Sequence, residues 1–523
     1  MWYNSEVESS RKNQSMFNRE SLIPSEHTLP PHQYSIMAPS ATKGVEPSTE
    51  GYIDVDELRT SFAMSLSAMY KKEVPLYGDL VRIVRTVNEE TLANLSDPRM
   101  VRMHHGGVAS ERLDLERHGA IRLGTPYELK TIRRLFALIG LHPVGYYDLS
   151  PSGLPMHATS FRPTSVASLK KNPFRVFTTL LRPDLLKDAE SRRLALDLLA
   201  RRDIFSAELL SLLDAADKQG GRLRKAQSDA FVREAMKTFG WRPVAAASKD
   251  DYLKLKVEHP ILADVACFQS SHINHLTPRT LSISAAQERM KTEGMAVKDR
   301  IEGPPARRCP ILLRQTSFLA LEEPIRFPTE TGETMTNGSH KARFGEIEER
   351  GAAVTPKGRK LYEKLMDNSM DEIAQLTEGH TSADEDAVLA QVFKQYPDTW
   401  EELRKRGLVY FEFRCEPSAH GQKISPNASL NSLLAQGVLE AVPVTYEDFL
   451  PLSAAGIFQS NLESGSKKTA SLTVSKGYAD KAGYERSLGV AVTDMDKWYA
   501  EAQSESLRRC ATKLNIAAGI LLQ

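Results

Sequence analysis

The sequence predicts an α+β fold in which many helices surround a curved sheet of mixed or antiparallel strands. Three observations lead to this class. Short segments that alternate apolar and polar residues, as strands do, occur in both halves of the chain. Apolar stripes at helical spacing lie between them. One strand-like segment, residues 116–124, leads directly into a helix-like segment, residues 125–141.

The first ordered element is predicted to begin near Asp54. Residues 1–50 precede it as a disordered extension, because the stretch 24–47 is rich in Pro, Ser, Thr and His and has no sustained period. Asp54 is a suitable helix cap, and apolar residues follow it at helical spacing, namely Leu58, Phe62, Met64, Leu66 and Tyr70.

The segment ERHGAIRLG, residues 116–124, is predicted to be a strand, because short apolar residues alternate with polar ones and a Gly ends it. Thr125 then caps a helix, with Pro126 at the first helical position and Glu128 in the first turn. A further strand is expected over residues 144–149.

A long helical region is predicted from Ser168 to Trp241, where leucines form amphipathic stripes. We interpret residues 166–255 as a helical insertion that packs on a core formed by residues 51–165 and 256–523. Within the second part of the core the sequence predicts strands and helices. The strands cover residues 272–279, 310–318, 342–351 and 408–415, and the helices cover residues 357–376 and 385–394.

The composition excludes several classes of protein. The 523 residues include 68 Lys and Arg and 67 Asp and Glu, so the net charge of +1 gives no reason to expect nucleic acid or an anionic membrane as a partner. No apolar run approaches the ~20 residues that span a bilayer, and the polar, acidic N-terminus lacks a signal core. The four cysteines form no CxxC pair, which fits reduced thiols and a cytoplasmic location.

Familiar catalytic motifs are also absent from the sequence. It contains no P-loop, no G-x-G-x-x-G fingerprint, no H-E-x-x-H and no G-x-S-x-G. The remaining candidates are His and Glu residues on predicted strands. His118, Ala120 and Arg122 share one face of their strand, which either presents a metal ligand and an anion-binding group to a cavity or forms a solvent-exposed polar edge.

Two histidines lie in the string SHINHLTPR. His272 and His275 are separated by an odd number of positions, so on a strand they point to opposite faces and are not expected to bind one metal together. His275 shares its face with Thr277, and Pro278 ends the strand.

Two carboxylates lie in the string FGEIEERG. Glu346 and Glu348 share one strand face, which either meets a cation inside the protein or is a solvated face. Two histidines and one carboxylate form the facial triad of Fe(II) oxygenases. The sequence spacing alone does not select this set, because the candidates lie far apart in the chain.

Long strings in this sequence resemble the 2-oxoadipate dioxygenase/decarboxylase family. They are ERHGAIRLGTPYELKTIRRLFALIGLHPVGYYDLS, SHINHLTPRTL, ARFGEIEERGAAVTPKGRKLY and FLPLSAAGIFQSNL. The resemblance extends from about residue 55 to the C-terminus. It implies a divergent vicinal oxygen chelate fold, a curved sheet of paired βαβββ modules. It also implies an Fe(II)-dependent enzyme that converts 2-oxoadipate and O2 to 2-hydroxyglutarate and CO2 in lysine catabolism.

The resemblance also implies roles for individual residues. His118, His275 and Glu346 match the iron ligands, and Glu348 matches a residue behind them. Arg122 matches the group that binds the distal carboxylate of the substrate, for which a guanidinium is well suited. Leu452 and Ser453 match a segment that closes over the substrate, although many relatives have Val at the position of Leu452.

The sequence leaves two alternatives open. The first is the same iron chemistry on another 2-oxo acid, such as an aromatic pyruvate, although Arg122 favours a diacid. The second is a metal-free protein with a structural or interaction role. The sequence does not predict the oligomeric state.

Overall fold

The computed structural model describes residues 51–94, 110–329, 334–377, 379–416, 425, 428–450 and 478–522. Residues 51–523 form one compact unit. The predicted disordered extension, residues 1–50, lies outside the described residues. None of the helices in the described ranges is long and apolar enough to cross a membrane.

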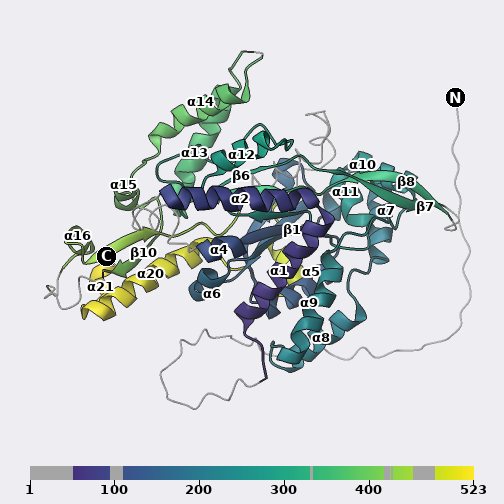
Figure 1. Ribbon diagram of the computed structural model, residues 1–523, viewed down its shortest axis with the longest axis horizontal. Helices are drawn as coiled ribbons and strands as arrows, with labels where there is room; N and C mark the ends of the chain where they lie inside the picture. Colours follow the sequence, from purple (N-terminus) through teal and green to yellow (C-terminus); the bar gives the residue numbers. More distant parts are fainter. Residues whose placement is uncertain are drawn as a thin grey trace, which may run out of the picture. The chain divides into compact units, whose positions relative to one another are not determined.

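A mixed five-stranded sheet lies at the centre of residues 51–522 and has the strand order β2-β3-β4-β1-β5 (Figure 1). β1 is parallel to β4 and antiparallel to β5, and the remaining neighbours are antiparallel. This sheet confirms a mixed α and β architecture. The strands are β1 (Arg117–Leu123), β2 (His142–Asp148), β3 (Met156–Arg162), β4 (Arg175–Leu181) and β5 (His275–Pro278).

The first part of the sheet follows the chain order β-α-β-β-β. β1 leads into α5 (Pro126–Leu138), and β2, β3 and β4 follow. The predicted cap is confirmed, because the Thr125 side chain accepts a hydrogen bond from the Glu128 amide at 3.2 Å. Apolar side chains of α5 then pack on the sheet, namely Leu129, Ile132, Leu135 and Phe136.

The prediction of an unbroken helical region from Ser168 to Trp241 is wrong over Arg175–Leu181, which forms β4. Every residue of β4 is buried, so the strand shows no alternation of apolar and polar residues. A short run of this kind cannot be distinguished from a buried helix by periodicity. The rest of the region is helical, with α6 (Val166–Lys171), α7 (Ala189–Ala200), α8 (Ala207–Lys218) and α9 (Lys225–Phe239).

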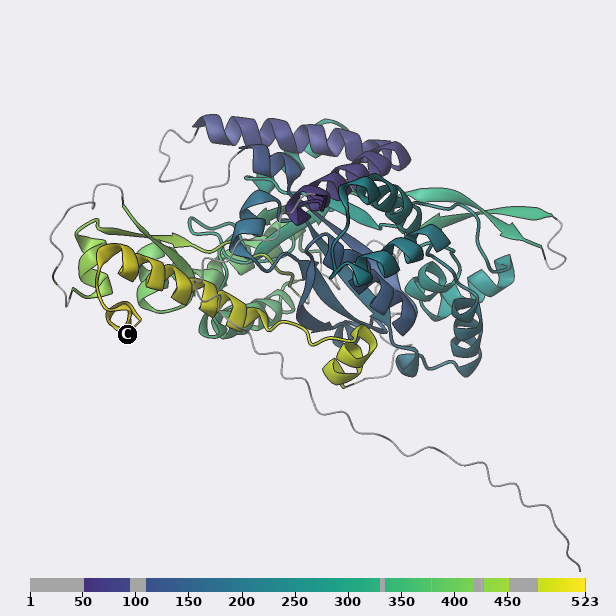
Figure 2. The ribbon, with the colours of Figure 1, turned by 90° about the horizontal axis from the view of Figure 1, so that it is seen from below.

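Two long helices, α1 (Val55–Glu73) and α2 (Pro75–Asn94), pack against each other above the sheet (Figure 2). Asp54 caps α1, as predicted, by accepting hydrogen bonds from the amides of Asp56 and Glu57. Most of the predicted apolar stripe is buried, but Met64 is 59% exposed. Met64 is only two positions from Phe62, so it points away from the buried face.

A second group of strands continues from β5. The helix α12 (Ile283–Thr292) follows β5, and β6 (Leu313–Ser317) pairs with β9 (Glu346–Arg350). A parallel bridge between Arg279 and Glu348 joins β9 to the end of β5, and the Thr280 amide donates to the Glu348 carbonyl at 2.8 Å. The strands β1, β5 and β9 therefore follow one another, in this order, across the centre of the fold.

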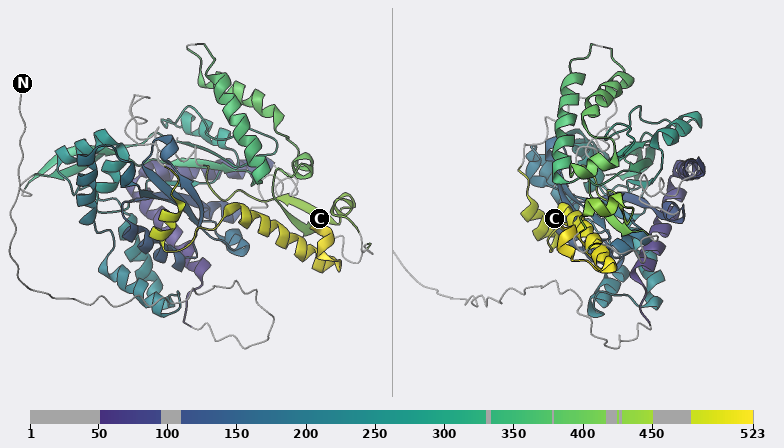
Figure 3. Two further views of the ribbon diagram at one scale, coloured as in Figure 1. Left: turned by 180° about the vertical axis from the view of Figure 1, so that it is seen from behind. Right: turned by 90° about the vertical axis from the view of Figure 1, so that its left-hand side faces the viewer.

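The remaining elements surround this centre. The hairpin of β7 (Glu322–Pro328) and β8 (Met335–Lys341), which the sequence did not predict, extends away from the five-stranded sheet in Figures 1 and 2. α20 (Met495–Leu514) lies along the antiparallel pair of β10 (Phe411–Cys415) and β11 (Leu439–Pro443) (Figure 3). The other elements are α4 (Ser110–Leu115), α10 (Lys249–Glu258), α11 (Pro260–Ala266), α13 (Pro356–Ile373), α14 (Ser382–Val392), α15 (Trp400–Lys405), α16 (Leu430–Ala435), α19 (Lys481–Leu488) and α21 (Ala518–Leu521).

Candidate metal centre

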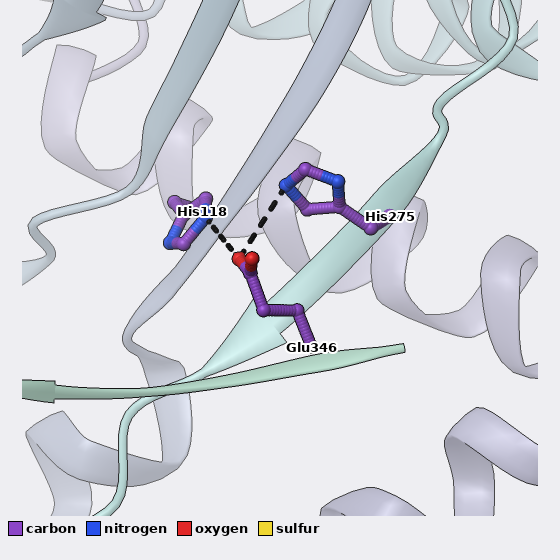
Figure 4. A group of neighbouring side chains, drawn as sticks. All are labelled: His118, His275 and Glu346. Atoms are coloured by element: carbon purple, nitrogen blue, oxygen red, sulfur yellow. Dashed lines mark ion pairs between the residues drawn. The ribbon is translucent and has the colours of Figure 1, made fainter. Parts of the chain in front are cut away.

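Three buried side chains from β1, β5 and β9 converge on one point (Figure 4). His118 Nε2 lies 2.9 Å from Glu346 Oε2, and His275 Nε2 lies 3.6 Å from the same oxygen. Ligand atoms of all three residues lie within 4.8 Å of one another. The structure thus brings together residues that are 157 (275 − 118) and 71 (346 − 275) positions apart in the chain.

The arrangement of the strands explains this convergence. In the antiparallel pair of β1 and β5, Ala120 lies opposite His275, and His118 lies opposite Thr277. Glu346 is the first residue of β9, which continues from the end of β5. Both β1 and β9 are buried at these positions, so the alternative of a solvated polar edge does not hold for either strand.

The Glu346 carboxylate is fixed by two neutral donors in addition to the histidines. Thr277 Oγ1 donates to Glu346 Oε2 at 2.8 Å, and Gln315 Nε2 donates to the same oxygen at 3.0 Å. Thr277 shares a strand face with His275, which the sequence indicated, whereas the sequence gave no signal for Gln315. These bonds hold the carboxylate in one orientation beside the histidines.

Glu348 lies behind His118 rather than beside the other ligand atoms. Its Oε2 atom is 2.9 Å from His118 Nδ1, on the opposite side of the ring from Glu346. Arg350 holds Glu348, with Nε donating to Oε1 at 2.9 Å. Arg350 is itself bonded to the carbonyls of Tyr446 and Asp448. A carboxylate at Nδ1 orients an imidazole so that Nε2 points to a metal.

Opposite charges control the ionisation of the site. Burial alone would raise the pKa of Glu346, but His275 and His118 hold that pKa below its ordinary value. Burial alone would lower the pKa of His118, but Glu348 and Glu346 raise it. Burial lowers the pKa of His275 to about 4, so this imidazole is neutral near neutral pH, the form in which histidine binds metals.

The donor set fits a divalent first-row metal. Two ligand atoms at about 2.1 Å from a metal and at right angles to each other are roughly 3 Å apart. The 2.9 Å and 3.6 Å separations from Glu346 Oε2 are compatible with ligands of one ion. Two imidazoles and one carboxylate on one side of an ion leave positions for substrate and O2, as in non-haem Fe(II) oxygenases.

His272 does not join this centre. It forms a second buried group with Asp264 and His340, and its Nε2 atom lies 3.1 Å from Asp264 Oδ1. The separation of His272 from His275 agrees with the prediction, but the physical reason differs. β5 begins only at His275, so His272 precedes the strand instead of occupying its opposite face.

Arg122 also lies on β1 and is buried, as is His118. Its Nη1 atom donates to Asp264 Oδ2 at 2.5 Å, a pairing that the sequence did not predict. The guanidinium charge contributes to the low pKa of His275, so it acts close to the metal centre. A partner 142 positions away carries no local sequence signal.

Leu452 and Ser453, expected to lie against the substrate, are outside the described residues. Phe449, shortly before them in the chain, is described. Its ring packs edge-on against His118, with 4.9 Å between the ring centroids. The chain before Leu452 therefore reaches the metal centre.

The chain is similar to known proteins along most of its length. Residues 62–461 match the profile of the 2-oxoadipate dioxygenase/decarboxylase family. A 2-oxoadipate dioxygenase/decarboxylase of Shigella flexneri is 45% identical over 460 residues, covering 88% of this chain and 98% of the relative. One from Pseudomonas putida is 43% identical over 470 residues, covering 89% of this chain and 99% of the relative.

A solved structure gives the same result. Hydroxyglutarate synthase of Pseudomonas putida in complex with 2-oxoadipate is 41% identical, with a TM-score of 0.79, and the match covers 89% of this chain and 100% of that one. These similarities confirm the family resemblance and the prediction of an oxidoreductase. The chain belongs to the 2-oxoadipate dioxygenase/decarboxylase family.

Proposed function

We propose that this protein uses Fe(II), held by His118, His275 and Glu346, to convert 2-oxoadipate and O2 to 2-hydroxyglutarate and CO2. The observation that carries the proposal is the buried group of two imidazoles and one carboxylate on β1, β5 and β9. The donor set is that of non-haem Fe(II) oxygenases. The relatives named for this reaction, at 43–45% identity, support the choice of substrate.

The protein residues hold and orient the reactants. His118, His275 and Glu346 would occupy one side of the ion, leaving the other side for the 2-oxo acid and O2. Bound Fe(II) supplies the redox chemistry that activates O2 for reaction with the 2-oxo acid. Thr277 and Gln315 fix Glu346, and Glu348 fixes His118, so the ligands need little rearrangement when substrate arrives.

Arg122 would bind the far carboxylate of the substrate. It lies four residues from His118 on the same strand face, roughly 13 Å along an extended strand at ~3.3 Å per residue. A six-carbon diacid that binds the metal through its 2-oxo acid end is shorter than this distance, and the His118 side chain with the metal and the Arg122 side chain would span the remainder. Leu452 and Ser453 are proposed to bind the substrate as well.

We also propose that the sheet is a divergent vicinal oxygen chelate core. The β1-α5-β2-β3-β4 order, with β1 parallel to β4, is one βαβββ module. β5, α12, β6 and β9 supply a partial second module, in which a parallel bridge likewise joins the first strand to the last. Each proposed histidine ligand would then come from the first strand of its module.

The test is oxygen uptake by the purified, Fe(II)-loaded protein with 2-oxoadipate, followed by identification of 2-hydroxyglutarate. Single Ala substitutions at His118, His275 and Glu346 should each abolish uptake and lower the iron content while the fold persists. Full iron occupancy in all three variants would contradict the ligand assignment. His272→Ala, a buried histidine three positions from His275, is the matched control and should retain its iron.

The competing substrate class is a 2-oxo acid without a second carboxylate. A panel of 2-oxoadipate, 2-oxohexanoate and phenylpyruvate separates the two classes. Preference for phenylpyruvate would assign the same iron chemistry to an aromatic substrate and remove the proposed role of Arg122.

A further inference from the structure

A second buried polar group lies at the other end of β1 from the metal centre. Asp264 on α11, His272 before β5 and His340 on β8 bring their ligand-type atoms within 4.8 Å of one another. Arg122 joins them through its bond to Asp264. All four side chains are at most 4% exposed. The proposed reaction leaves Asp264, His272 and His340 without a role.

The Asp264 carboxylate is the centre of this group. Its Oδ2 atom accepts from Arg122 Nη1 at 2.5 Å. Its Oδ1 atom lies 3.0 Å from His340 Nε2 and 3.1 Å from His272 Nε2. Burial opposes ionisation, but Arg122 and His272 hold the pKa of Asp264 well below its ordinary value. Asp264 is therefore a fixed negative charge that faces Arg122 on one side and two imidazoles on the other.

The hydrogen bonds converge on the Asp264 carboxylate, from Arg122 on one side and from His340 on the other. A carboxylate only accepts, so His340 presents Nε2–H to Asp264, and in the neutral imidazole the Nδ1 atom is the acceptor. The Tyr252 hydroxyl lies 3.0 Å from His340 Nδ1, the shorter of its two polar contacts. Burial raises the pKa of Tyr252, so the hydroxyl keeps the proton that it donates. Tyr252, His340 and Asp264 thus fix the position of the guanidinium.

Aromatic rings enclose the same group. The Trp241 ring centroid is 4.7 Å from that of His272, and the Phe268 centroid is 4.7 Å from that of His340. These apolar walls exclude water and strengthen the electrostatic interactions inside them. They also limit the movement of the imidazoles, so the carboxylate that holds Arg122 cannot shift easily.

A second metal ion is the competing interpretation of Asp264, His272 and His340. That ion would have to share the single carboxylate of the group with a guanidinium 2.5 Å away. Burial lowers the pKa of His272, so this imidazole is neutral and offsets none of the charge of a cation. A divalent cation would leave uncompensated positive charge in a buried site, which is costly. The pair of Arg122 and Asp264 is already balanced without one.

We infer that Asp264, supported by His340 and Tyr252, positions Arg122 and thereby sets the preference of the enzyme for 2-oxo acids with a second carboxylate. A guanidinium has five N–H donors in a planar fork and can bridge two carboxylates. Asp264 would hold one edge so that another edge meets the substrate. Asp264 is a positioning residue in this scheme, and the inference rests on the proposed function of Arg122.

The test compares kcat/KM for 2-oxoadipate and for 2-oxohexanoate, which has the same chain length but lacks the second carboxylate. Asp264→Asn should lower the ratio of the two values about ten-fold. The loss should appear mainly as a higher KM for 2-oxoadipate, with similar values for 2-oxohexanoate. In an Arg122→Ala background, Asp264→Asn should change the ratio no further, because the residue acts only through Arg122.

A matched control accounts for the general effect of breaking a buried ion pair. Asp56 and Arg59 form an ion pair at 2.7 Å, and Arg59 is fully buried, where it also donates to the carbonyls of Ile139, Ser168 and Asn172. Asp56→Asn should therefore affect stability but not the ratio. If Asp264→Asn does not fold, Tyr252→Phe removes only the outermost donor and should lower the same ratio by a few-fold.

Several results would overturn the inference. They are an unchanged ratio, an equal loss on both substrates, or a higher ratio, which would mean that Asp264 competes with the substrate for Arg122. Metal analysis gives another: two ions per wild-type chain and one per Asp264→Asn chain would assign the group to a metal. Absence of 2-oxoadipate turnover in the wild type would instead overturn the proposed function itself.

Discussion

Glu348 offers a quantitative test of how the metal centre is held. Its carboxylate oxygen is 2.9 Å from His118 Nδ1 and its side chain is fully buried. Glu348→Gln keeps the shape of the side chain and removes its charge. A hydrogen bond to a charged group contributes about 1.5–3 kcal/mol, so its loss corresponds to roughly ten- to a hundred-fold in metal affinity. Residues that orient a histidine ligand typically have effects of this size.

The same substitution should also destabilise the protein. Glu348 pairs with Arg350 at 2.8 Å, and Arg175 Nη1 lies 3.9 Å from its other oxygen. Breaking a buried ion pair costs about 3–5 kcal/mol. The loss of stability in Glu348→Gln should fall at the lower end of this range, because Arg350 keeps its bonds to the carbonyls of Tyr446 and Asp448.

The measurement is an anaerobic Fe(II) titration of the folded protein, with circular dichroism to verify the fold. Glu349→Gln is the matched control, because Glu349 neighbours Glu348 on β9 but contacts Arg314 and the Ile283 amide instead of His118. We expect a ten- to hundred-fold rise in Kd for Glu348→Gln, with no comparable change for Glu349→Gln. Equal Kd values for the two variants would refute the idea that Glu348 holds His118.

Three further predictions concern stability. Burial, then Arg122, lowers the pKa of His259 from 6.5 to about 4, so its stabilising contribution is present above pH 6.5 and is lost as pH falls towards 4. His259→Asn keeps an acceptor for the Ile261 amide. In urea unfolding, this variant should lose less stability than the wild type between pH 7 and 4.5. An equal loss in both proteins would mean that other groups cause the acid sensitivity. A Cβ at Gly351 would lie 2.3 Å from the Pro310 carbonyl carbon, so Gly351→Ala should lower the free energy of unfolding by about 1–3 kcal/mol. Gly78 has open space around it, so Gly78→Ala should not have this effect. Equal melting temperatures for the two variants would contradict the packing argument. Residues 51–523 form a compact unit, so a chain that starts at Gly51 should keep its melting temperature and turnover, and a fall of many degrees would show that residues 1–50 contribute to the fold.

The sequence predicted those parts of the fold that depend on local pattern. The strand at His118, the Thr125 cap and the helix after it follow from residues that are neighbours in the chain. The Asp54 cap is of the same kind. The sequence did not predict β4, because a strand buried on both faces shows no alternation. Nor could it predict that β4 is the parallel neighbour of β1, since pairing between distant strands leaves no local signal.

The candidate site likewise has residues that the sequence indicated and contacts that it could not predict. Residue type and strand face indicated His118, His275 and the Glu346–Glu348 pair as candidates. The resemblance to a family then selected the ligands among them. The pairing of Arg122 with Asp264 and the bond from Gln315 to Glu346 could not be predicted, because each joins segments whose proximity depends on the complete sheet.

The order β1, β5, β9 has a consequence for how the proposed metal centre would be filled during synthesis. His118 and Glu346 are 228 positions apart (346 − 118), so at 5–20 residues per second roughly ten to forty-five seconds separate their appearance. A nascent chain that ends before β9 has the histidines but not the carboxylate, and it offers an incoming ion an incomplete set of ligands. At the proposed centre, metal binding would therefore stabilise most the chains in which all three strands have paired. The rate at which the proposed centre takes up Fe(II) after release from the ribosome should consequently report the completion of the long-range sheet. A chain truncated before Glu346 should fail to retain the ion even where β1 and its neighbours are folded.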